Sequence, residues 1–160
     1  MELLQSPSYI ALSITFLSFC AMLWMLYAWL PDSLHRRFAL DLASSGMNAT
    51  LLLQISSAIG LLSGGALGDW TRRRLALIGL GLLLAAPFAW WCFAASTLAQ
   101  VRIAEVAFGL FSGLMLSNVI PAAYDYVPHS QYGWTAGWMT LVGGLGGGLS
   151  MLAAGVWLTK

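Results

Sequence analysis

The side chains best able to do chemistry in this sequence gather in one short segment. In GALGDWTRRR, which runs from Gly65 to Arg74, a single acid, Asp69, is followed by the three arginines Arg72, Arg73 and Arg74. Asp69 can form an ion pair with one of these arginines across a short turn, and Gly65 would let another helix approach closely. An ordinary charged loop, with its arginines held at lipid phosphates, explains the same residues equally well.

Four uncharged polar residues lie inside otherwise apolar stretches. They are Tyr27, Gln54, Ser117 and Asn118. In a membrane, such groups either line the path of a polar solute or hydrogen-bond one helix to the next. The residue types and spacing leave both interpretations open.

The remaining charged residues and Ser112 give little evidence for proton coupling or for an enzyme. Arg102 and Glu105 are one helical turn apart, so we expect them to neutralise each other near a membrane surface. The other four apolar stretches have no acid in their middle, so a buried carboxylate that could couple transport to protons is not evident. Ser112 lies in GLFSG, but no histidine within an apolar stretch could act as its base. We expect no catalytic site, no metal and no cofactor.

The composition indicates what surrounds these residues. Of the 160 residues, 59% are hydrophobic and 8% are charged, whereas soluble domains average roughly 25% charged residues. So few charges cannot cover a water-soluble surface of this size, and we expect the lipid bilayer as solvent. The net charge of +1 gives no support for nucleic-acid binding.

The apolar stretches divide into five segments long enough to cross a membrane, because about 20 apolar residues span the hydrocarbon core. Proline and charged or glycine-rich turns separate them. The sequence therefore predicts an all-α membrane protein with one transmembrane domain over residues 1–160 and helices at about 9–30, 47–68, 75–98, 101–123 and 132–158.

Small residues recur every four positions in two of these segments, which favours close contact between helices. They are Ser56, Gly60, Gly64 and Gly68 in one segment, and Gly109, Gly113 and Ser117 in another. The last segment is still richer in glycine, and one hypothesis is that these glycines let the helix bend or slide.

The segment around Asp69 resembles the signature of the major facilitator superfamily, roughly G-x-x-x-D-R-x-G-R-R, which joins the second and third helices of each half. Trp70 stands where that signature has arginine, and Arg72 where it has glycine. YAWLP at 27–31, Asn118, YDYVP at 124–128 and the glycine-rich last helix are similar to the C-terminal half of sugar-acid and organic-anion symporters in that superfamily.

The resemblance implies a gating motif and a topology. Gly65, Asp69, Arg73 and Arg74 would clasp helices on the cytoplasmic side and release them as access switches. The loop of residues 32–46 would lie outside. The first and fourth helices of a half line the cavity in this family, which favours Tyr27, Ser117 and Asn118 as residues on the substrate path and leaves Gln54 less certain.

The family also sets an expectation about what is missing. Its members have two bundles of six helices, and rocking transport needs both. Five helices would form a partial six-helix bundle, so we expect a truncated or split permease for a small polar or anionic solute, inactive without a partner half. The alternative is a small non-transporting membrane subunit or a remnant. We expect an integral protein of the bacterial inner membrane.

Overall fold

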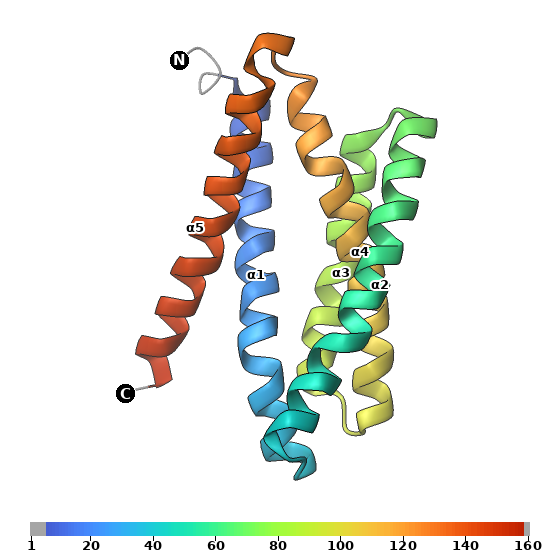
Figure 1. Cartoon of the computed structure of the whole chain (residues 1–160), viewed down its shortest axis with the longest axis vertical. Helices are drawn as coiled ribbons and strands as arrows, with labels where there is room; N and C mark the ends of the chain where they lie inside the picture. Colours follow the sequence, from blue (N-terminus) through green and yellow to red (C-terminus); the bar gives the residue numbers. More distant parts are fainter. Residues whose placement is uncertain (1–5, 159–160) are drawn as a thin grey trace. The chain divides into compact units, whose positions relative to one another are not determined.

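The computed structural model describes residues 6–158, so the predicted domain's residues 1–5 and 159–160 lie outside the described part. Within it the chain forms five α-helices and one short 3₁₀ helix (Figure 1). Their bounds are α1 Pro7–Phe38, α2 Leu42–Thr71, α3 Arg74–Ala94, α4 Leu98–Tyr124, η2 His129–Gln131 and α5 Tyr132–Leu158.

The five α-helices confirm the predicted fold class. Among the described residues, each of five helical spans is long and apolar enough to cross a membrane. At about 1.5 Å per residue, the shortest, α3, measures roughly 30 Å, which matches the hydrocarbon core. The longer helices therefore extend into the headgroup region at one or both ends.

The predicted end of the first helix at Leu30 is wrong. The α1 helix continues through Pro31 to Phe38. Proline removes one backbone N–H, but a helix tolerates this loss where the surroundings satisfy the freed carbonyl. Beyond Pro31 the helix becomes polar, and an ion pair between Arg36 and Asp32, with Nε to Oδ2 at 2.9 Å, supports its last turns.

The predicted start of the second helix at Met47 is also too late, because Asp41 caps α2 from Leu42. The Asp41 carboxylate accepts a hydrogen bond from the Ser44 N–H at 3.0 Å. Interactions with the Ser44 side chain and backbone N–H lower the pKa of Asp41 below its ordinary value. The cap therefore stays charged at neutral pH.

Two capping hydrogen bonds at the start of α4 place the turn between α3 and α4 earlier than the sequence predicted. The Gln100 N–H donates to the Thr97 hydroxyl at 3.3 Å, and the Gln100 side chain accepts from the Ser96 N–H at 3.0 Å. This exchange fixes the start of α4 at Leu98, a residue that we had assigned to the preceding helix.

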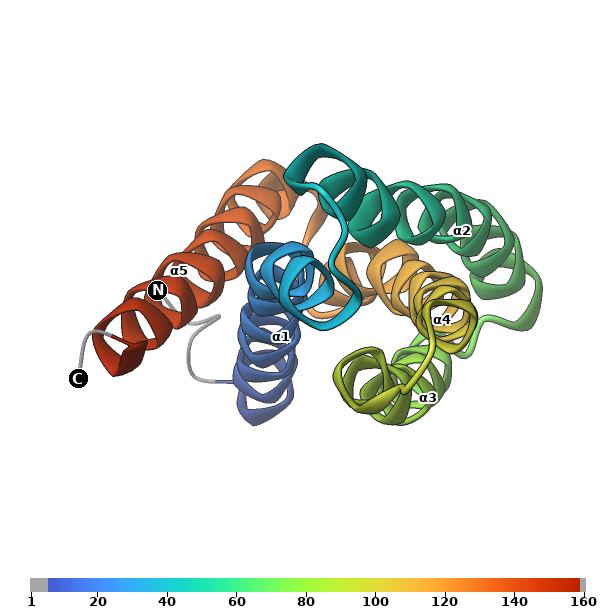
Figure 2. The same cartoon turned by 90° about the horizontal axis from the view of Figure 1, so that it is seen from below.

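The chain divides into two compact units, each described by itself. The unit of residues 26–118 holds α2, α3, the greater part of α4 and the end of α1. Viewed along the helices, α4 lies between α2 and α3 (Figure 2). Early residues of α2 contact early residues of α4, as Asn48 does with Arg102, and later residues contact later ones, as Gly64 does with Ser117. These two helices therefore run parallel.

Glycines set the distance between α2 and α4. A Cβ built on Gly60 would lie 2.9 Å from the carbonyl carbon of Leu110, and one on Gly113 would lie 2.6 Å from the backbone nitrogen of Leu61. Both are backbone atoms, which cannot move aside. The predicted stripes of small residues thus face each other across one interface.

The other unit comprises residues 1–25 and 119–160 and pairs α5 with the first half of α1. A Cβ on Gly143 would lie 2.9 Å from the Phe16 ring, and the Trp138 indole N–H donates to the Ser13 hydroxyl at 3.2 Å. The helix stays regular throughout despite its glycines. Several of these glycines therefore serve packing, whereas Gly144 and Gly148 have open space beside them.

Two matched substitutions test the α2–α4 interface. Gly60→Ala forces a methyl group against the α4 backbone, and we expect a loss of about 1–3 kcal/mol in stability. Gly79→Ala on α3 meets nothing within 4 Å, and we expect a gain of about 0.5–1 kcal/mol from better helix propensity. Thermal unfolding in detergent, followed by circular dichroism, measures both. Equal behaviour of the two variants would contradict the close contact.

Candidate functional site

The turn between α2 and α3 carries an ion pair between the acid and the last arginine of the predicted motif. Nη2 of Arg74 donates to Oδ1 of Asp69 at 2.5 Å. Asp69 lies in the last turn of α2 and Arg74 is the first residue of α3. The Arg74 side chain is 22% exposed and that of Asp69 is 74% exposed. The pair thus reaches from solvent into the bundle.

The backbone of this turn departs from ordinary geometry at Arg72. Its φ of 55° and ψ of 19° are left-handed, a conformation in which glycine has no steric penalty. The family signature has glycine at this position. Arg72 therefore adopts, at a cost in backbone energy, a conformation that a glycine at this position would adopt without strain.

Asn118 of α4 completes the network. It is fully buried and accepts a hydrogen bond from Nη1 of Arg74 at 3.4 Å. Its own amide donates to the carbonyl oxygens of Gly64 at 3.0 Å and Leu114 at 2.9 Å. We call Asp69, Arg74 and Asn118 the clasp, because they join the end of α2, the start of α3 and the last third of α4.

The clasp brings together residues that the sequence analysis had assigned to separate roles. Asn118 was predicted on the substrate path, yet its side-chain oxygen accepts from Arg74 of the predicted gating motif, and its amide donates to backbone carbonyls. Ser117 is half-buried beside it, with its hydroxyl donating to the Leu114 carbonyl at 3.1 Å. A Cβ on Gly68 would overlap the Asn118 side chain, so Gly68 makes room for the clasp.

The remaining motif residues lie outside these contacts. A Cβ on Gly65 would meet nothing within 4 Å, so the close approaches fall at Gly64 and Gly68. Arg73 is exposed and precedes α3 as its N-cap residue without a side-chain capping bond. The predicted gating roles of Gly65 and Arg73 stay predictions.

The other two predicted path residues also meet. The Tyr27 hydroxyl of α1 donates to Oε1 of Gln54 in α2 at 3.1 Å. Tyr27 is half-buried and Gln54 is exposed. This pair forms a polar position in the interior of two membrane-spanning helices, near the middle of α2 and in the second half of α1.

The sequence analysis missed one site, Glu105. Its side chain is 0% exposed, and neither carboxylate oxygen has a hydrogen-bond partner among the described residues. The expected ion pair with Arg102 does not form. Arg102 instead donates to Oδ1 of Asn48, from Nη2 at 2.8 Å and from Nε at 3.3 Å. The one-turn spacing suggested mutual neutralisation, but it could not show that Arg102 bonds to Asn48 on another helix.

No group of three histidine, cysteine or acidic side chains that could hold a metal ion occurs among residues 6–158. Within the same residues, five helices that are long and apolar enough to cross a membrane define the class of the protein, an integral α-helical membrane protein.

The family model of the Major Facilitator Superfamily matches residues 3–160. The chain belongs to this superfamily of membrane transporters, which carry small solutes across the lipid bilayer and are generally not enzymes. Comparison with curated proteins and with solved structures gave no match.

The clasp predicts unequal effects when its buried member, Asn118, and its exposed member, Asp69, are replaced. Asn118→Ala removes a buried amide and leaves Arg74 without one of its acceptors, so we expect a stability loss of about 1–3 kcal/mol. Asp69→Asn breaks an exposed ion pair, and we expect a loss of at most about 1 kcal/mol. Thermal unfolding in detergent at two salt concentrations measures both. An Asp69→Asn variant as unstable as Asn118→Ala would show that the pair serves folding first.

The left-handed turn predicts that Arg72→Gly is more stable than Arg72→Ala by roughly 1 kcal/mol. Both variants remove the same charge, so their difference isolates the backbone conformation. Their unfolding temperatures in the same detergent give the comparison. Equal temperatures would mean that the turn relaxes when the arginine is lost.

Proposed function

We propose that the chain forms one half of an ion-driven symporter for a small polar or anionic solute, most like the C-terminal half of sugar-acid and organic-anion symporters. The observation that carries the proposal is the ion pair between Asp69 and Arg74. It occupies the position of the family's gating signature, and it persists although Trp70 and Arg72 depart from that signature.

The clasp has the geometry of a contact that can both hold and release. Arg74 is anchored from within by Asn118, while Asp69 stays largely exposed. Breaking the outer ion pair exchanges it for water at a cost of about 0–1 kcal/mol. The inner bonds meanwhile keep α2, α3 and α4 together. Asp69 can therefore change partners without unfolding its own bundle.

Tyr27 and Gln54 form the proposed solute contact. A hydroxyl and a carboxamide offer both donors and acceptors, which suits hydroxyl and carboxylate groups of a small polar solute. Their mutual hydrogen bond holds the Gln54 side chain in place for the solute. Ser117 is a further candidate for this path.

Glu105 is the proposed coupling residue. An acid within a membrane helix is costly to bury, and such acids are therefore rare. Those that occur commonly mark paths for ions or protons. Its carboxylate is buried without a hydrogen-bond partner among the described residues. We infer that Glu105 binds and releases the proton that drives the solute.

A second helical bundle would complete the transporter, supplied by a partner half. Alternating access needs two bundles that rock about a shared site, and the five helices here belong to one of them. We propose that the complete protein works in the bacterial inner membrane.

The test is uptake of labelled sugar acids and small carboxylates by cells of the native host, with and without the gene for this chain. We expect gene-dependent uptake of at least one solute, lost in Asp69→Asn at unchanged protein level. Asp32→Asn is the matched control, because Asp32 forms a similar exposed ion pair with Arg36. Glu105→Gln should remove the dependence of uptake on external pH.

Each outcome has a defined meaning. Uptake that survives Asp69→Asn as well as Asp32→Asn would overturn the gating role. Gene-independent uptake of every solute, together with stoichiometric co-purification of another membrane protein, would favour the alternative of a non-transporting subunit. A pH dependence unchanged in Glu105→Gln would remove that residue from the coupling step.

A further inference from the structure

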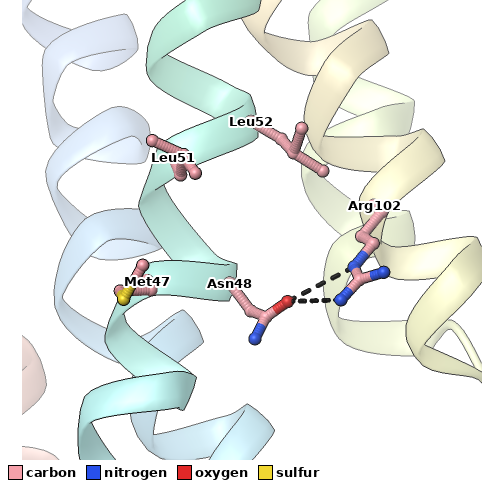
Figure 3. Close-up of a pocket in the computed structure, with 5 residues that line it drawn as sticks. All are labelled: Met47, Asn48, Leu51, Leu52 and Arg102. Carbon is pink, nitrogen blue, oxygen red and sulfur yellow. Dashed lines mark hydrogen bonds between the residues drawn. The ribbon is translucent and has the colours of Figure 1, made fainter.

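Two hollows on the surface of the 26–118 unit meet at one cation. The larger, of about 510 Å³, lies between α3 and α4 and is lined by Phe88, Val106, Leu110 and Phe111 among others. The smaller, of about 270 Å³, lies along α2 beside Met47 and Leu51. Leu52 and Arg102 line both hollows, and Figure 3 shows Arg102 facing the start of α2.

Arg102 is held in place by hydrogen bonds to a neutral side chain. Two of its N–H groups donate to the Asn48 side-chain oxygen (Figure 3). Asn48 is itself fixed, because its amide donates to the Ser44 carbonyl at 2.8 Å. A guanidinium has five N–H donors, so three remain for another acceptor. Arg102 forms no ion pair within the described part of the chain.

The depth of Arg102 matches the boundary between headgroups and hydrocarbon. The α4 helix has 27 residues, about 40 Å, which exceeds the hydrocarbon core by roughly 10 Å. Arg102 follows the first residue of α4 by four positions, about 6 Å along the axis. The apolar stripe from Ile103 to Phe111 continues inward from it for about 12 Å.

We propose that this surface is a binding site for one anionic phospholipid, with its phosphate on Arg102 and its two acyl chains in the two hollows. A phosphodiester accepts parallel hydrogen bonds from a guanidinium, and the rest of the lining is almost wholly apolar. One cation where two apolar hollows meet matches a molecule with one anionic head and two chains. A flat helix face would offer neither the hollows nor the charge.

The site is distinct from the clasp and from the proposed solute contact, and it does not depend on the proposed function. The lipid would cover exposed apolar side chains such as Met47 and Leu51. It would also bridge α2, α3 and α4 at the ends opposite the clasp, because α2 and α4 both begin there.

The experiment titrates the purified full chain, in an uncharged detergent, with dioleoylphosphatidylglycerol and follows adducts by native mass spectrometry. We expect one saturable adduct. Dioleoylphosphatidylcholine, with the same chains and no net charge, should bind more weakly, and glycerol 3-phosphate, with the head anion alone, should not bind. Arg102→Gln should weaken binding by about tenfold, because it removes the charge-assisted hydrogen bonds to the phosphate.

Arg36→Gln is the matched control, because it removes an equal charge outside the hollows, and it should bind as the wild type does. Ala107→Trp places a large ring in the larger hollow and keeps the arginine at position 102. It should also reduce binding, which keeps the test decisive if Arg102→Gln folds poorly. Equal binding of glycerol 3-phosphate would overturn the proposal in favour of a soluble-anion site. Unchanged binding in both variants, or a protein chain bound in place of the lipid, would overturn it as well.

Discussion

The rest of this structure depends on close contact between the backbones of α2 and α4. Lipid tails are as apolar as leucine, so helices in a membrane gain no hydrophobic energy from meeting. Association then comes from short-range packing and hydrogen bonds, both of which need the axes to be near each other. Glycine at Gly60 and Gly113 permits this distance, and one added methyl group would oppose it.

The polar sites follow from that contact. Asn118 reaches the Gly64 carbonyl of α2 only because the two helices touch, and from there it accepts from Arg74 of α3. Near the other ends of the same pair, Asn48 and Arg102 meet by the same route. One packed interface therefore positions two sites near opposite ends of the bundle, although neither helix brings more than a few polar side chains.

Composition and segment length were enough to predict the membrane helices, because the thickness of the hydrocarbon core is a strong constraint. The ends of these helices were harder. Pro31 suggested a stop, but the polar residues after it continue the helix, and the cap at Asp41 begins the next one early. The short spacing in GALGDWTRRR predicted that Asp69 can pair with an arginine, and the structure pairs it with Arg74. The direction in which Glu105 and Arg102 point depends on neighbouring helices, which no local spacing reveals.

The contacts of α4 also bear on how the protein is made. This helix contains side chains that make membrane insertion costly, namely a buried acid, a buried carboxamide and an arginine. The described partners of Asn118 and Arg102 on other helices all belong to α2 and α3, which the ribosome completes first. When α4 leaves the translocon, the helices that carry its hydrogen-bonding partners are already inserted in the bilayer. The order of helices along the gene thus matches the order in which their polar groups need one another.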